Sequence, residues 1–527
     1  MKNTTEFTHI PKDMFAFVNH GERISDKKFE DKPIGYFKDA WIRFCKNKAS
    51  IVAAIIILCI LAFAVVAPLA ITTHNATFMD TYYSRKPPRN ALLSNIGIAD
   101  GGTNRDFSEQ GIVKAVAVGM GAEDRDGSGT VTLEEGMASE YQPILDIMGS
   151  REVSEIRGVP PRTIYSAHIE NYLEVGFLYF SIPQSQYYDI LEWQEETGLQ
   201  VLYPLIANNE YTMDSADANY WYKTDSRGNP VRTTADGGTE EIEYAEGMVL
   251  EDNYLRDENG DPVYYEYTGG GTHETAQFRV RVLYYNYYQY RNGFEPYYLM
   301  GTDSQGYDLT LRLADGIKLS VLLAICVSAI NLVIGAIYGA IEGYYGGAVD
   351  MVLERIVDIL ANVPFVVVAT LFQMHLATQV GAIPSLLFAF VLTGWISTAA
   401  RTRTQFYRFK GQEYVLAART LGARDRRIIW KHIFPNSLGT IITASALVIP
   451  GVINTESMLS YLGIVKLNTA SVTSLGNLLA SASNIWTSYP HLMLFPAIVI
   501  SLLMICFNLF GNGLRDAFNP SLRGVEE

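Results

Sequence analysis

A run of 21 consecutive residues without a charged side chain, Ile51 to Ile71, constrains this chain more than any other feature. At about 1.5 Å per residue, a helix of this length spans roughly 30 Å, which is the thickness of the hydrocarbon core of a bilayer. The run begins too far from Met1 for a typical signal peptide, and no clear cleavage site follows it. We therefore expect it to be a retained transmembrane helix.

Further apolar segments crowd into the second half of the chain. They lie at Leu319–Ile341, Val357–Val380, Ser385–Ala399, Ser437–Ile453 and Leu492–Phe510. With the first run they predict six transmembrane helices, and a set of buried helices in a soluble protein is the weaker alternative. The predicted fold class is therefore an α-helical polytopic membrane protein.

Charge divides the chain into two unlike parts. Residues 75–312 have a net charge of −21 and hold 25 of the 33 tyrosines, whereas the remainder has a net charge of +6. Basic residues gather before the first span and between the fourth and fifth spans, so the positive-inside rule places both segments and both termini in the cytoplasm. The acidic block then lies outside the cell. This pattern excludes a one-domain soluble enzyme and argues against a partner nucleic acid.

These observations divide the chain into five parts. They are a cytoplasmic segment at 1–49, the first span at 50–73, an extracellular insertion at 74–312, a membrane core at 313–512 with a cytoplasmic loop at 401–436, and a cytoplasmic tail at 513–527. Alternating residues predict strands at 263–267 and 278–283, with a turn at 257–261, so we expect the insertion to be an α+β domain. Its tyrosines either grip passing peptides or pack internally.

Residues 124–135 match the twelve-residue calcium loop of an EF-hand, with Gly129 at the tight turn. The expected oxygen ligands are Asp124, Asp126, Ser128, Thr130, Thr132 and Glu135. Helices are expected on both sides, at 110–120 and 139–148. A weakly bound Ca²⁺ that fixes the shape of the domain is the predicted cofactor, and a solvated acidic loop without an ion is the alternative.

The cytoplasmic loop has a helix–glycine–helix pattern. Residues 413–421 favour a helix in which Ala417 and Ala418 are small enough for a partner to approach closely, and Gly422 suits the left-handed conformation that ends a helix. Residues 424–433 favour a second helix, which Pro435 is expected to end. From these residues alone, a docking surface and an ordinary basic loop are equally open.

Five motifs stand in one order along the second half of the chain. They are G-T-D-S-Q-G-Y-D at 301–308, G-Y-Y-G-G at 343–347, E-x3-A-A-x3-G with H-I-F-P-N at 413–436, S-Y-L-G at 460–463, and G-N-G-L-R-D followed by N-P at 511–520. Together they resemble the C-type permease subunit of the oligopeptide/dipeptide/nickel family of binding-protein-dependent ABC importers. The resemblance covers residues 299–523 and, weakly, the first span. That family usually has a short stretch where this chain has its insertion.

The resemblance implies a type I ABC importer permease fold in a bacterial cell membrane, and we expect a Gram-positive source. It places Glu413, Ala417, Ala418 and Gly422 in a coupling helix that docks on an ATPase subunit. The implied partners are a homologous second permease, two cytoplasmic ATPases that use ATP, an extracellular substrate-binding lipoprotein, membrane lipid and peptide cargo.

The chain itself is expected to be a transport subunit and not an enzyme. It contains no Gly-Lys dipeptide, which a Walker A phosphate loop requires. Its four cysteines lie outside the insertion and lack the spacing of a zinc site. Two other functions remain open: import of nickel or another small solute, within the same family, and a membrane-anchored receptor or sensor, outside it. A coupling loop distinguishes an importer from a sensor.

Overall fold

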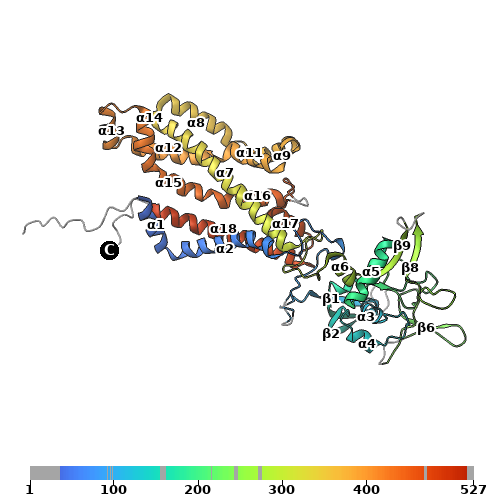
Figure 1. Ribbon diagram of the computed structural model, residues 1–527. Coiled ribbons are helices and arrows are strands. Elements are labelled where there is room, and N and C mark those ends of the chain that lie inside the picture. The colour runs from blue at the N-terminus through green and yellow to red at the C-terminus, as the bar shows by residue number, and fades with distance from the viewer. Residues whose placement is uncertain are drawn as a thin grey trace, which may run out of the picture.

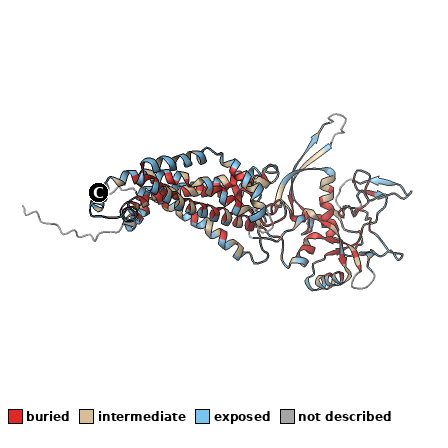
Figure 2. Ribbon diagram, turned by 90° about the horizontal axis from the view of Figure 1, so that it is seen from above, coloured by how far each residue is buried: buried red, intermediate tan, exposed pale blue. Residues whose placement is uncertain are grey.

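The structure separates a helical bundle from a strand-containing insertion (Figure 1). This computed structural model describes residues 36–518, apart from 92, 95–96, 98, 155–161, 215, 243–246, 271–275 and 468–471. Buried residues run through the interior of both parts, whereas the outer faces of the bundle helices are largely exposed (Figure 2). Such apolar exposure is expected of helices that face lipid or a partner subunit.

Five helices or helix runs among the described residues are long and apolar enough to cross a bilayer. They are α2 (Lys48–Ala70), α7 (Leu309–Tyr345), α11 and α12 (Ala382–Gly394 and Ile396–Lys410), the run at Asp425–Tyr461, and α18 (Pro490–Phe518). Shorter helices are α1 (Tyr36–Lys46), α10 (Ala377–Val380), α13 (Glu413–Thr420) and α17 (Leu475–Ala482).

The segment predicted as the third span is bent. It falls on α8 (Gly347–Ala361) and α9 (Phe365–His375), whose axes meet at 73°. Pro364 lies at the break, and a proline disfavours helical geometry in the residue before it. The bundle has six spans if this bent pair crosses the bilayer as one.

A seam of glycines brings α7 against α12. Gly335, Gly339 and Gly343 occur at every fourth position of α7 and face the backbone and small side chains of α12. A Cβ atom on Gly339 would overlap the carbonyl oxygen of Ala399. Small residues at this spacing allow helices to pack closely in membranes. The two helices therefore pack closely, with backbone and Cβ atoms of α12 nearest to the glycines.

The expectation that Pro435 ends the second helix of the loop at 401–436 is wrong. The helix continues from α14 (Asp425–Arg427) through a π-helical turn into α15 (Phe434–Ala446) and α16 (Val448–Tyr461). In the π turn, Phe434 N–H donates to the Ile429 carbonyl, five residues back. Pro435 then stands at the start of α15, directly after the π turn.

Antiparallel strands and helices form the insertion. The first sheet has the order β1-β3-β2, from Gly102–Ser108, Arg162–Glu170 and Ile144–Val153, and α3 (Glu109–Glu123) contacts it. In the second sheet β9 pairs with three strands: β9 is Gln277–Leu283, and its partners β4, β5 and β8 are Phe177–Pro183, Leu202–Tyr203 and Tyr265–Gly269. The insertion also contains β6 (Val231–Thr233), β7 (Thr239–Glu241), α5 (Gln184–Thr197) and α6 (Tyr284–Asn292).

The helix predicted at 139–148 is wrong, whereas the strand predicted at 278–283 lies in β9. The helix after the calcium loop is the short α4 (Leu133–Ala138), which ends at Ser139. From Ile144 the chain instead pairs with β3. That partner strand comes later in the sequence, so local helix propensity could not indicate the competing pairing.

Many tyrosines of the insertion pack in its interior. Tyr83, Tyr172 and Tyr298 are at most 1% exposed, and the Tyr172 and Tyr298 rings stack with their centres 6.1 Å apart. The hydroxyl groups of Tyr288 and Tyr298 lie 2.9 Å apart. For these residues, internal packing is the correct alternative and peptide contact is not.

Candidate functional site

The two ends of the insertion meet beside the membrane part. Arg89 N–H donates to the carbonyl oxygen of Tyr298 at 2.9 Å. In the G-T-D-S-Q-G-Y-D motif, Gly306 has a φ of +93°, and a Cβ atom on it would overlap the Asp80 carbonyl. This motif therefore forms a turn that only glycine fits, and the turn holds the outgoing and returning chains together.

The same motif starts the central helix α7. Asp308 caps the helix, because its Oδ1 accepts a hydrogen bond from Thr310 N–H at 2.7 Å. Its Oδ2 lies 3.0 Å from Nε2 of His74, just beyond the first span, and both side chains are 2% exposed. The base of the insertion is thus bonded to both spans that flank it.

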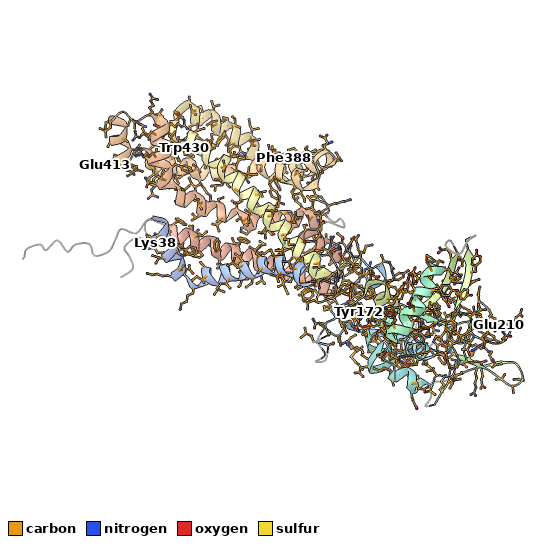
Figure 3. The ribbon with its side chains drawn as sticks, in the orientation of Figure 1. Lys38, Tyr172, Glu210, Phe388, Glu413 and Trp430 are labelled. Carbon is orange, nitrogen blue, oxygen red and sulfur yellow. The ribbon has the colours of Figure 1, made fainter. Side chains whose placement is uncertain are left out.

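At the opposite end of the bundle, α13 carries the residues predicted to couple the chain to an ATPase (Figure 3). Glu413, Ala417 and Gly422 are exposed and Ala418 is half-buried. Gly422 has a φ of +83°, the left-handed conformation expected for it. Leu421 beside it is 88% exposed. The loop therefore presents acidic, small and apolar groups on one protruding surface.

A small apolar cluster joins this loop to the bundle. Val415 is the one buried residue of α13. It belongs to a cluster with Ile428 and Ile433 from the following helix, Tyr344 at the end of α7, and Phe406 in α12. Val415 thus packs α13 against the bundle, and the predicted coupling residues lie outside the cluster.

Sequence reasoning missed a buried carboxyl group near α17. Glu456 in α16 is 1% exposed and accepts hydrogen bonds from the hydroxyls of Ser320 at 3.0 Å and Ser460 at 2.9 Å. Ser474, which caps α17, lies 3.5 Å from the Ser460 hydroxyl. The S-Y-L-G motif, which Ser460 begins, was the one sequence signal near this site. Ser320 lies 136 residues from Glu456 in sequence, so no local pattern joins them.

The predicted calcium loop joins α3 to α4, and its first half is ordered around Asp124. Gly129 has a φ of +74°, and its N–H lies 3.0 and 3.2 Å from the two Asp124 carboxylate oxygens. Ser128 N–H donates to Asp126 at 3.0 Å, and the Ser128 and Thr130 hydroxyls lie 2.8 Å apart. Burial raises the pKa of Asp124 above its ordinary value, although its hydrogen bonds oppose the shift.

The second half of the loop does not join this group. Glu135 accepts hydrogen bonds from the N–H and hydroxyl of Thr132, at 2.8 and 2.9 Å, and so caps α4. In the part of the chain that the structure describes, no three His, Cys, Asp or Glu side chains gather closely enough to hold a metal. The structure therefore brings Asp124, Asp126, Ser128 and Thr130 together but leaves Thr132 and Glu135 bonded to each other.

Two family models match the parts of the chain on either side of the insertion. The "Binding-protein-dependent transport system inner membrane component" matches residues 332–524. The "N-terminal TM domain of oligopeptide transport permease C" matches residues 35–88. The second match ends one residue before Arg89, where the two ends of the insertion meet.

Curated relatives agree with the family models. The chain is 39% identical over 223 residues to the oligopeptide transport system permease protein OppC of Bacillus subtilis (strain 168), which covers 42% of this chain and 72% of that protein. The Haemophilus influenzae OppC is 40% identical over 44% of this chain and 72% of its own length. The dipeptide transport system permease protein DppC of Bacillus subtilis (strain 168) is 37% identical over 42% of this chain and 68% of its own length.

A solved structure of the MetNI methionine ABC transporter in an inward-facing conformation is also similar. It is 15% identical, with a TM-score of 0.33 over 39% of this chain and 94% of that one. The identity to the curated permeases, over more than two thirds of their length, is what establishes the relationship. The chain therefore belongs to the binding-protein-dependent transport system inner membrane components, as a C-type permease subunit of the oligopeptide/dipeptide/nickel ABC importer family.

Proposed function

We propose that this permease subunit imports oligopeptides or dipeptides as one half of a transmembrane channel of the type I importer fold. The observation that carries the proposal is its identity of 37–40% to permeases named for oligopeptide and dipeptide transport. Import of nickel or another small solute is the second candidate within the family. Uptake of casein-derived peptides, set against uptake of nickel, by cells that carry the complete transporter distinguishes the two.

The proposed topology places the coupling loop and both termini in the cytoplasm of a bacterial cell, for which we propose a Gram-positive source. Lys38 and Glu413 lie at one end of the bundle and the insertion lies at the other, which supports this arrangement (Figure 3). A homologous second permease completes the channel, and two ATPase subunits bind the cytoplasmic side. A substrate-binding lipoprotein delivers the peptide outside. ATP then acts only through the partner subunits, and this chain is not an enzyme.

In this proposal α13 is the coupling helix. Glu413 offers a charge to the ATPase surface, Ala417 and Ala418 allow close approach, and Gly422 provides the turn at the end of the helix. The exposure of Glu413, Ala417 and Gly422 on a protruding loop supports these roles. A membrane-anchored receptor or sensor, the alternative from another class, has no need of such a loop.

Reversal of the Glu413 charge tests the coupling role. We expect Glu413→Lys to leave the chain in the membrane with its partner permease, but to abolish peptide uptake and substrate-stimulated ATP hydrolysis. Glu195→Lys makes the same charge change on α5 of the insertion and serves as the matched control. Gly422→Pro, which cannot adopt the positive φ of this position, should act like Glu413→Lys. Normal coupling in both loop variants would reject the assignment.

We also propose that residues 124–135 bind Ca²⁺, as a cofactor of the insertion and not of transport itself. The proposed ligands are Asp124, Asp126, Ser128, Thr130, Thr132 and Glu135. The left-handed Gly129 and the position of α4, which begins at the tenth residue of the loop, support the proposal. Binding requires Glu135 to exchange its hydrogen bonds with Thr132 for the ion.

The insertion, finally, is proposed to extend the surface on which the external binding protein docks and to line part of the path of the peptide. Its bonded base beside α7 supports this role, because the domain cannot move far from the mouth of the channel. A passive spacer without contact to the cargo is the alternative.

A further inference from the structure

The hydroxyl group of Tyr344, at the cytoplasmic end of α7, contacts both limbs of the coupling loop. It donates a hydrogen bond to Oδ1 of Asp425 in α14 at 2.6 Å. It also accepts one from the guanidinium of Arg419 in the last turn of α13, at 3.3 Å. Tyr344 is 7% exposed, whereas Arg419 and Asp425 are exposed, so the protein shields these bonds from water on the tyrosine side.

Few other side-chain contacts fix the relative orientation of the two limbs. One is the hydrogen bond that Nδ2 of Asn436 in α15 donates to the hydroxyl of Tyr414 in α13 at 3.2 Å. The limbs are separated by Gly422, whose φ of +83° and exposure make it the point where the chain turns. On α13, apolar packing is confined to Val415. An apolar contact at one residue sets how deep a helix lies but allows it to rotate, whereas hydrogen bonds are directional.

Tyr344 also belongs to a rigid part of the bundle. It follows Gly343, the last glycine of the seam at which α7 and α12 touch. The guanidinium of Arg419 lies 5.8 Å from the centre of the Tyr344 ring, so ring and hydroxyl both face the loop. A movement of the loop that keeps these contacts must therefore move the end of α7.

We propose that Tyr344 is a positioning residue that fixes the angle of the coupling helix relative to α7 and so passes movement between the ATPase and the channel. The inference rests on the proposed coupling role of α13. The second tyrosine of the G-Y-Y-G-G motif supplies a natural comparison: Tyr345 is 54% exposed, and its hydroxyl makes no hydrogen bond to the described residues.

The test compares Tyr344→Phe with Tyr345→Phe in the complete transporter, reconstituted in liposomes with its second permease, ATPases and binding protein. Peptide uptake is measured with casein-derived oligopeptides, and ATP hydrolysis is measured in parallel. We expect Tyr344→Phe to raise the ATP consumed per imported peptide at least threefold, while the concentration of binding protein that gives half-maximal uptake changes less than twofold. Tyr345→Phe should change neither quantity.

A second variant removes the same bond from the loop side. Asp425→Ala removes the acceptor of an exposed side chain, and it should raise the ATP cost like Tyr344→Phe, without a further increase when both are combined. An unchanged ratio in Asp425→Ala and Tyr344→Phe, or an equal rise in Tyr345→Phe, would overturn the proposal. Glu413→Lys distinguishes failure of the Tyr344 proposal from failure of the proposed coupling role of α13. If Glu413→Lys abolishes coupling while Tyr344→Phe leaves the ATP cost unchanged, only the role of Tyr344 fails. If Glu413→Lys couples normally, the role of the loop fails first.

Discussion

Glu135 occupies the last ligand position of the proposed calcium loop, whereas its neighbour Glu134 occupies none. We expect Glu135→Gln to weaken calcium binding at least tenfold, because the change removes a charged bidentate ligand. Calorimetric titration of the purified full-length chain measures the effect. Glu134→Gln, which removes a charge from the same helical turn, should bind like the unmutated chain. A titration of the unmutated chain without heat at millimolar calcium would show that the loop holds no ion.

Glu170, at the end of β3, should make the insertion less stable as the pH rises. Burial raises its pKa from 4.5 to about 7, although Arg89 opposes the shift at 3.3 Å. The folded state then holds a proton that the unfolded state releases, so stability decreases between about pH 4.5 and 7, by at most about 3 kcal/mol.

Thermal unfolding of the full-length chain, followed by aromatic fluorescence at several pH values, tests this sign. Glu170→Gln should remove most of the pH dependence between pH 5 and 7, since the amide cannot ionise. A melting temperature that rises over this interval in the unmutated chain would contradict the prediction.

Single residues could be predicted from sequence where a local pattern determined them. The positive φ of Gly129 and Gly422 followed from a loop and a helix end a few residues long. Glu170 and Glu456 could not be found in this way. The partners that bury them, such as Arg89 and Ser320, lie 81 and 136 residues away in sequence.

At the scale of elements, the glycine seam between α7 and α12 predicts that one added methyl group lowers thermal stability at the seam but not at a glycine outside it. Gly339→Ala should lower the thermal midpoint of the purified chain, because the new Cβ overlaps the Ala399 carbonyl and overpacking costs about 1–3 kcal/mol. Gly451→Ala adds the same methyl group to α16, where no described atom lies within 4 Å, and should not lower it. Equal midpoints for the two variants would mean that the seam can open without cost.

Five of the six predicted spans fall on helices that are long and apolar enough to cross a bilayer, because apolar runs indicate them without help from distant residues, whereas the third falls on the bent pair α8 and α9. Predictions failed where contacts with distant or neighbouring segments determine the secondary structure. A π turn carries the helix past Pro435, and the segment expected to be a helix at 139–148 pairs with β3 instead. The helix expected at 413–421 is present as α13, but its bond to Tyr344 joins segments 75 residues apart and has no local signature.

For the whole molecule, the hydrogen bond between Arg89 and Tyr298 shows where the insertion can be removed. Replacement of residues 90–297 by a two-residue Asn-Gly turn should preserve the base that joins the flanking spans, because the ends already lie at hydrogen-bond distance. We expect assembly with the partner permease and ATPases to persist and peptide uptake to fall when the binding protein is limiting.

Uptake at several binding-protein concentrations tests this expectation. Recovery of full uptake at saturating binding protein would agree with a docking role, whereas uptake unchanged at every concentration would leave only the spacer. A chain that no longer assembles would show instead that the insertion supports the fold of the bundle.

The division into a basic helical frame and an acidic insertion was visible in the charge of the sequence alone. The exact point of division was not, because residues 75–89 are polar like the insertion but bond to the turn that starts α7. The order of strands in the two main sheets was equally hidden, since β9 pairs with β4 across about a hundred residues.

The glycine seam also provides an internal reference distance for spin-label spectroscopy. Because the glycines of α7 pack directly against α12, a change in the separation of these helices would break close contacts. Spin labels on the outer faces of these two helices should report one constant distance with or without nucleotide. Distances measured from this pair to a label on another helix can then be compared with that constant distance, so movements of the other helices during the transport cycle could be measured within the same molecule.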